Sequence, residues 1–175
     1  MNKIIKAIQF CQEKHKGQTR KVSGEPYASH PIAVSYLVAS YKKSKKIEDL
    51  LIAAMLHDTL EDTETTFVEL STEFSPLVAS LVLELSNDPV ELSKLGKLEY
   101  QKRKLCGMSS YGLVIKLCDR LHNILDHPSP KMVLETIELL QHLQTKRKLS
   151  KTHKKILTDI IGICATIQSS SELQK

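Results

Sequence analysis

The chain has 175 residues, of which 41% are hydrophobic and 5% aromatic, and it carries a formal net charge of +5. This apolar content is enough for one ordinary core, and the length fits one domain, which we place at residues 1–170, followed by a polar tail at 171–175 that we expect to be frayed. No apolar run approaches the ~20 residues that cross a bilayer, so we expect no membrane segment.

The hydrophobic residues are mostly aliphatic and recur at helical spacing. Tryptophan is absent, and such a core favours helices packed on helices over a sandwich or barrel. Ile4, Ile8 and Cys11 mark the apolar face of the first helix. The sequence predicts an all-α bundle with helices at about residues 3–14, 31–41, 47–60, 65–74, 76–86, 93–106, 111–125, 131–148 and 151–168.

Local signals mark where several of these helices begin. Pro31 and Pro76 stand at the first-turn position that proline favours. Thr65 or Thr66 with Glu69 resembles a capping box. The loop between the first two helices is rich in turn residues and also carries charged and aromatic side chains: Gly17, Arg20, Lys21, Ser23, Gly24, Pro26 and Tyr27.

Metal-capable residues interrupt the apolar helices at two places. His57 and Asp58 directly follow the apolar segment LLIAAML, where an imidazole and a carboxylate are costly without a partner. Glu61 and Asp62 follow them at a spacing of four, which on a continuous helix directs both pairs to the same face. A divalent cation is one partner that suits such a group.

The second place is the apolar helix that contains Asp119, with Asn123 one turn further on. His30, at the start of the second helix, can point across the bundle. His30, His57, Asp58 and Asp119 together form a mixed nitrogen and oxygen set, which suits Mn²⁺, Fe²⁺ or Mg²⁺ better than a structural zinc site. Taken singly, each of these residues is more often a helix cap or a satisfied polar group.

The remaining chemistry of the chain is less specific. Its positive charge attracts anions, but no recognised nucleic-acid module accompanies the lysine runs, so we expect no nucleic-acid partner. The cysteines lack CxxC spacing and lie in apolar surroundings, which is typical of reduced thiols in a cytoplasmic protein: Cys11, Cys106, Cys118 and Cys164.

The order H…HD…D resembles the signature of the HD phosphohydrolases. Three flanking segments resemble the hydrolase motifs of the RelA/SpoT family: GQTRKVSGEPYASHP, AAMLHDTLEDT and VIKLCDRLHNILD, which span Gly17 to Asp126. The short chain is similar to the stand-alone small alarmone hydrolases, including the metazoan SpoT homologue. The resemblance implies hydrolysis of the 3′-pyrophosphate of the guanine nucleotides ppGpp and pppGpp.

The resemblance also implies a role for particular residues. His30, His57, Asp58 and Asp119 fall on the metal-ligand positions of the family, with Mn²⁺ the usual ion. Glu61 and Asp62 fall on the acidic pair that orients and activates water. Five positions fall on residues that hold the nucleotide: Arg20, Lys21, Ser23, Tyr27 and Asn123.

Two other hypotheses remain open at this point. The metazoan relatives are also associated with removal of the 2′-phosphate of NADPH, and one pocket could serve both substrates. A non-catalytic nucleotide-binding module is the second alternative.

Overall fold

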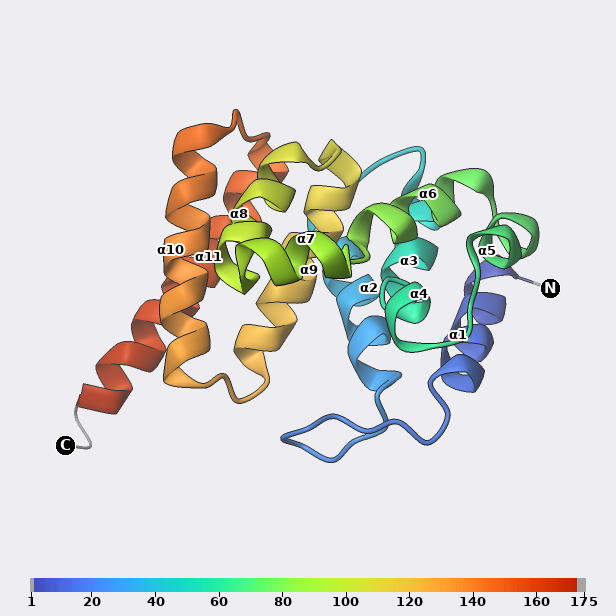
Figure 1. Ribbon diagram of the computed structural model, residues 1–175, viewed down its shortest axis with the longest axis horizontal. Coiled ribbons are helices and arrows are strands. Elements are labelled where there is room, and N and C mark those ends of the chain that lie inside the picture. The colour runs from blue at the N-terminus through green and yellow to red at the C-terminus, as the bar shows by residue number, and fades with distance from the viewer. Residues whose placement is uncertain (1, 173–175) are drawn as a thin grey trace.

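The computed structural model describes residues 2–172, and this range folds into helices joined by short connections (Figure 1). The all-α class predicted from the sequence is confirmed. The helices are α1 (Lys3–Lys14), α2 (Ser29–Tyr41), α3 (Ile47–Met55), α4 (Thr59–Asp62), α5 (Phe67–Glu73), α6 (Pro76–Leu85), α7 (Pro89–Leu95), α8 (Lys97–Gly107), α9 (Ser110–Leu125), α10 (Pro130–Lys146) and α11 (Lys151–Glu172).

Helix α9 lies at the centre, packed against α2 on one side and α11 on the other (Figure 1). Helix α3 packs on α2, α1 and α6, while α10 packs on α8 and α11. One hydrophobic cluster runs through these layers, with Leu50, Leu117 and Leu140 among its fully buried side chains. Because α2, α3 and α9 meet near the centre, polar residues on these helices face one another inside the protein.

Two of the predicted start signals coincide with capped helix ends, at α5 and α6, whereas α2 begins two residues before Pro31 and has no side-chain cap. Thr66 accepts a hydrogen bond from the Glu69 amide, and the Glu69 carboxylate accepts one from the Thr66 amide, which completes a capping box. Ser75 and Ser129 cap α6 and α10, each directly before a proline. Caps depend on contacts within a few residues, so the sequence alone can predict them.

The predicted continuous helix over 47–60 is wrong, because the chain turns at residues 56–58 between α3 and α4. The Ala54 carbonyl accepts a hydrogen bond from the His57 ring, and the Leu56 carbonyl accepts from the amide and hydroxyl of Thr59. A continuing helix would use these carbonyls for amides four residues ahead. The side chains of His57 and Thr59 therefore end α3 early.

The single helix predicted over 93–106 is also wrong. The structure has α7 and α8 there, separated at Gly96, whose φ of 75° lies in the left-handed region. A residue with a side chain is strained at this angle, whereas glycine is not.

We expect the substitution Gly96→Ala to lower the free energy of unfolding by about 1 kcal/mol, through backbone strain alone. The added methyl group would meet nothing within 4 Å, so no steric clash contributes. Gly107 is the matched control, because it is helical and equally open, and Gly107→Ala should be neutral or slightly stabilising. Urea denaturation of both variants measures the difference, and equal stabilities would contradict the prediction.

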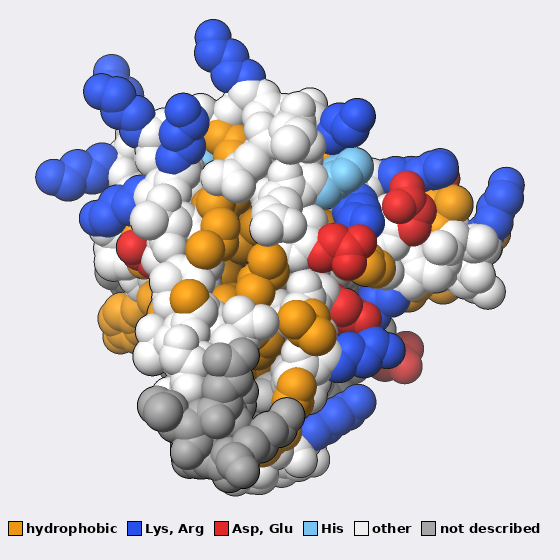
Figure 2. Space-filling view, turned by 90° about the vertical axis from the view of Figure 1, so that its left-hand side faces the viewer, with side chains coloured by type: hydrophobic (Ala, Val, Ile, Leu, Met, Phe, Trp, Pro, Cys, Tyr) orange, Lys and Arg blue, Asp and Glu red, His pale blue; other side chains and the backbone are white. Residues whose placement is uncertain are grey.

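Helix α11 extends to Glu172, beyond the predicted end at residue 168. The described part of the predicted frayed tail, residues 171 and 172, is therefore helical, and 173–175 lie outside the described residues. No described helix is both long enough and apolar enough to cross a membrane. At the end of the molecule formed by α10 and α11, a strip of hydrophobic side chains is exposed, with Lys and Arg side chains on both sides of it and Asp and Glu side chains mainly on the right (Figure 2).

Candidate metal centre and active site

Two histidines from different elements point into the centre of the bundle. His30 lies in the first turn of α2 and His57 in the turn after α3, and both are at most 2% exposed. The Nδ1 atom of His57 lies 2.8 Å from the Ala54 carbonyl, to which it donates, so Nε2 is the ring nitrogen that faces the cluster and could bind a metal ion. This Nε2 atom is buried and has no hydrogen-bond partner among the described residues, which fits a nitrogen that binds a metal ion.

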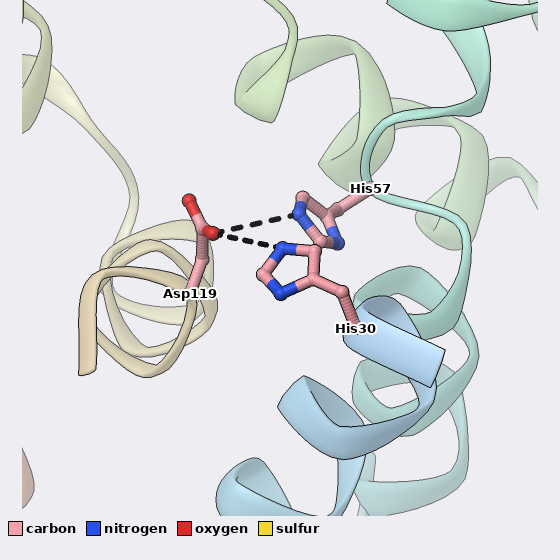
Figure 3. Close-up of side chains that lie close together, drawn as sticks. All are labelled: His30, His57 and Asp119. Atoms are coloured by element: carbon pink, nitrogen blue, oxygen red, sulfur yellow. Dashed lines mark ion pairs between the residues drawn. The ribbon is translucent and has the colours of Figure 1, made fainter. Parts of the chain in front are cut away.

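Two carboxylates face these imidazoles. Asp119 Oδ1, from α9, lies 3.2 Å from His30 Nε2 and 3.8 Å from His57 Nε2 (Figure 3). Asp58 Oδ2 lies 3.0 Å from His57 Nε2 and 4.0 Å from His30 Nε2. His30, His57 and Asp119 form a buried group whose ligand atoms all lie within 4.8 Å of one another, close enough to hold a metal ion.

The electrostatics of this cluster favour a cation at its centre. Burial alone would raise the pKa of Asp119, but Lys116 and the two histidines hold it well below its usual value. Burial lowers the pKa of His57, whereas the carboxylates of Asp58 and Asp119 more than offset this and raise it to about 9. The carboxylates thus remain ionised and draw positive charge to the imidazoles, which is the environment that a divalent cation would satisfy.

Glu61 and Asp62 make different contacts, although their spacing from His57 and Asp58 predicted that both would point to the side of those two residues. Both carboxylate oxygens of Glu61 accept hydrogen bonds from Asn87. The backbone amide of Asn87 donates to Oε1 at 2.5 Å, and its side-chain Nδ2 atom donates to Oε2 at 3.0 Å. Asp62 lies nearer the cluster, and its pKa is raised, first by burial and then by the Asp58 carboxylate. Consecutive residues of one helix point about 100° apart, so the two acids diverge within α4, and the turn at 56–58 removes the continuous helix that their spacing from His57 and Asp58 assumed.

The loop between α1 and α2 brings Arg20 against the end of α9. Its guanidinium donates to Asp126 Oδ2 at 2.9 and 2.6 Å and to Asn123 Oδ1 at 3.0 Å. Asn123 also donates to Asp119 Oδ1 at 2.7 Å, so a chain of hydrogen bonds runs from the metal-capable cluster to Arg20.

A cavity of about 480 Å³ opens beside this chain of hydrogen bonds, and four residues expected to bind the nucleotide line it: Arg20, Lys21, Tyr27 and Asn123. Ser23, the fifth, is exposed and does not line the cavity. Tyr27 also donates to Asp58 Oδ2 at 2.6 Å, which links the loop to the metal-capable cluster.

Sequence reasoning missed two residues that contact this site. Lys116 Nζ lies 3.0 Å from Asp119 Oδ2, and Asp126 holds Arg20. Lys116 could have been found, because a lysine within the apolar segment LVIKLCD needs an anionic partner, whereas Asp126 gives no such local signal. From the sequence, His122 had only a weak case as a support for the metal ligands, and its Nδ1 atom lies 3.0 Å from His30 Nδ1.

Comparison with known proteins assigns this arrangement to a class. The HD domain family matches residues 7–157, and the chain belongs to this family. Its two histidines and two aspartates are the residues that the H…HD…D order singled out in the sequence.

Within this family the chain is similar to the MESH1 and SpoT proteins, which confirms the resemblance seen in the sequence. The guanosine-3′,5′-bis(diphosphate) 3′-pyrophosphohydrolase MESH1 of Danio rerio is 35% identical over 124 residues, covering 70% of this chain and 68% of that protein. The Homo sapiens MESH1 is 36% identical over 126 residues, with the same coverage. A solved structure of a metazoan orthologue of SpoT that hydrolyses ppGpp superposes with a TM-score of 0.75 at 26% identity, over 91% of this chain and 94% of that one.

Proposed function

We propose that this chain hydrolyses the 3′-pyrophosphate of ppGpp and pppGpp. Water oxygen bonds to the phosphorus attached to the ribose 3′ oxygen, and the bond between that phosphorus and the 3′ oxygen breaks, which releases pyrophosphate and GDP or GTP. The observation that carries the proposal is the convergence of His30, His57, Asp58 and Asp119 from three separate segments. The named activity of the MESH1 relatives supplies the substrate.

We propose Mn²⁺ as the resident ion, with Fe²⁺ and Mg²⁺ as alternatives, held by His30, His57, Asp58 and Asp119. The mixed nitrogen and oxygen donors support this choice, as does the unpartnered Nε2 atom of His57. Bound there, such an ion would polarise the phosphoryl oxygens and lower the pKa of water.

We assign proton transfer to Asp62 and orientation to Glu61. The raised pKa of Asp62 makes its carboxylate a better acceptor for the proton of the attacking water. Both oxygens of Glu61 are held by Asn87, so this carboxylate has a fixed direction and can accept a hydrogen bond from water without moving.

We propose that the nucleotide occupies the cavity beside Arg20. Because Asp126 and Asn123 bind Nε and Nη2 of the guanidinium and Tyr27 lies over one of its faces, the opposite face can stack on a purine. Lys21 then offsets phosphate charge and Tyr27 keeps Asp58 in place. We propose that Ser23 helps to hold the conformation of the loop, since its hydroxyl accepts a hydrogen bond from the Glu25 amide at 3.5 Å.

The test is a panel of ppGpp, pppGpp and NADPH incubated with protein and Mn²⁺, with the products separated by chromatography. We expect pyrophosphate with GDP or GTP, and no turnover after chelation. If the protein releases inorganic phosphate from NADPH and turns over neither ppGpp nor pppGpp, its substrate is the 2′-phosphate of NADPH instead. Nucleotide binding without turnover of any substrate would indicate a non-catalytic module.

We further propose that residues 1–170 act as one unit, supported by the single hydrophobic cluster that includes side chains from α1 through α11. A cytoplasmic location is supported by the free thiols of all four cysteines: Cys11, Cys106, Cys118 and Cys164.

A further inference from the structure

Helix α4 carries both acids of the proposed active site but cannot hold its own orientation. It has four residues, Thr59–Asp62, and a single helical turn is unstable in isolation. The carbonyls at its end have no partner within the helix. Its direction therefore depends on neighbours, and Asn87 supplies one of them through Glu61.

Gln18 supplies the second neighbour, from the loop after α1. Its side-chain Nε2 atom donates to the Asp62 carbonyl at 2.8 Å. The Gln18 backbone is itself fixed, because its amide donates to the His15 carbonyl at 3.0 Å and its carbonyl accepts from the Tyr27 amide at 2.9 Å. Gln18 thus caps the end of α4 from a position that the surrounding loop determines.

His15 sets which way the Gln18 amide faces. Its Nδ1 atom lies 2.8 Å from Gln18 Oε1. Because Gln18 must present its NH₂ group to the Asp62 carbonyl, its oxygen must face His15, and His15 Nδ1 must carry the proton. The relay therefore runs in one direction, from the His15 ring through the Gln18 amide to the Asp62 backbone.

The burial of His15 has no explanation in packing alone. The side chain is 2% exposed, and its Nε2 atom has no hydrogen-bond partner among the described residues, which costs free energy that an aromatic hydrocarbon would not. Its ring lies 4.8 Å from the Tyr27 ring, centroid to centroid, and Tyr27 donates to Asp58. One imidazole thus contacts the supports of both α4 and Asp58.

We propose that His15 and Gln18 are positioning residues that hold Asp62 at the angle needed to accept a proton from water. The proposal rests on the proposed hydrolase function. His15 supplies a flat ring that packs on Tyr27 and an Nδ1 donor that orients Gln18, and the donor is the feature on which the position of Asp62 depends.

The test compares Gln18→Leu and His15→Phe with His15→Asn. Leucine removes the donor to Asp62, and phenylalanine keeps the ring on Tyr27 but removes the donor to Gln18. Asparagine retains a donor near the position of Nδ1. His142→Asn, on α10, is the control for loss of a histidine elsewhere.

We expect kcat to fall by on the order of ten- to a hundredfold in Gln18→Leu and His15→Phe, as for other supports of active-site groups. KM and the affinity for Mn²⁺, titrated without substrate, should stay within about threefold of the unmodified protein because the ligands are untouched. His15→Asn should recover most of kcat. Amides of residues 59–63 should exchange hydrogen faster in the two impaired variants, even without metal.

Unchanged kcat in Gln18→Leu, or His15→Asn as impaired as His15→Phe, would overturn the proposal. So would a parallel loss of kcat and Mn²⁺ affinity, which would place the effect on the metal ligands. Gln18 is only half-buried, so this variant should fold even if substitutions of His15 do not. If the unmodified protein fails to hydrolyse ppGpp, the proposed function fails, while the exchange measurement still decides whether His15 and Gln18 hold α4.

Discussion

Asp119→Asn is expected to abolish hydrolysis of ppGpp and to weaken Mn²⁺ binding by more than about a hundredfold. Replacing even the supports of metal ligands costs about 10–100-fold, and Asp119 is assigned as a ligand itself. The substitution keeps the shape of the side chain but removes the negative charge that faces His30, His57 and Lys116. Isothermal titration with Mn²⁺ and assay of pyrophosphate release measure the two effects.

Asp159→Asn is the matched control for this prediction. Asp159, on α11, accepts a hydrogen bond from Tyr41 at 2.6 Å, so it is also a carboxylate with a defined partner. This variant should bind Mn²⁺ and turn over substrate normally. Retained Mn²⁺ affinity and activity in Asp119→Asn would refute the ligand assignment.

Lys116→Met is expected to destabilise the metal-free protein by about 2 kcal/mol, less than the 3–5 kcal/mol for a fully buried pair because the side chain is 15% exposed. The ammonium group is the nearest cation to Asp119, at 3.0 Å, and it also lies in the field of Asp58. Without the Lys116 ammonium group, the histidines alone must offset the negative charges of Asp58 and Asp119. A bound divalent cation compensates the same charges, so saturating Mn²⁺ should raise Tm more in this variant than in the unmodified protein.

Lys102→Met is the control, because Lys102 forms a 2.6 Å ion pair with Glu138, whose carboxylate side chain is 56% exposed and therefore solvated without it. Its loss should change Tm little, with or without Mn²⁺. Equal Tm shifts on adding Mn²⁺ to Lys116→Met and to the unmodified protein would show that Lys116 and the ion do not compensate the same charge.

The turn at residues 56–58 shows where prediction from the sequence ends. The apolar run LLIAAML continues the helical pattern to its last residue, so periodicity gave no reason to stop the helix before His57. The competing hydrogen bonds from His57 and Thr59 end it. The residues that the sequence selected as chemically active are thus the ones that break its regular structure.

Arg20 shows a different limit. Its motif predicted contact with the nucleotide, but the sequence contained no sign that Asp126 and Asn123 would bind its guanidinium edge. This pairing favours stacking on the purine as the way in which Arg20 contacts the nucleotide. It depends on how the loop after α1 lies against the end of α9, which is a matter of packing.

The amino-acid sequence by itself determined the all-helical class, the capping box of α5, the proline at the start of α6, and the identity of the metal-capable residues. These depend on apolar periodicity, on hydrogen bonds between near neighbours and on the cost of placing charge beside apolar runs. Only the tertiary structure decided that Asn87 holds Glu61, that Asp126 holds Arg20, and that Gln18 supports α4. Each of those contacts joins segments that are distant in the chain, and only the packing of helices around α9 brings them within hydrogen-bonding distance.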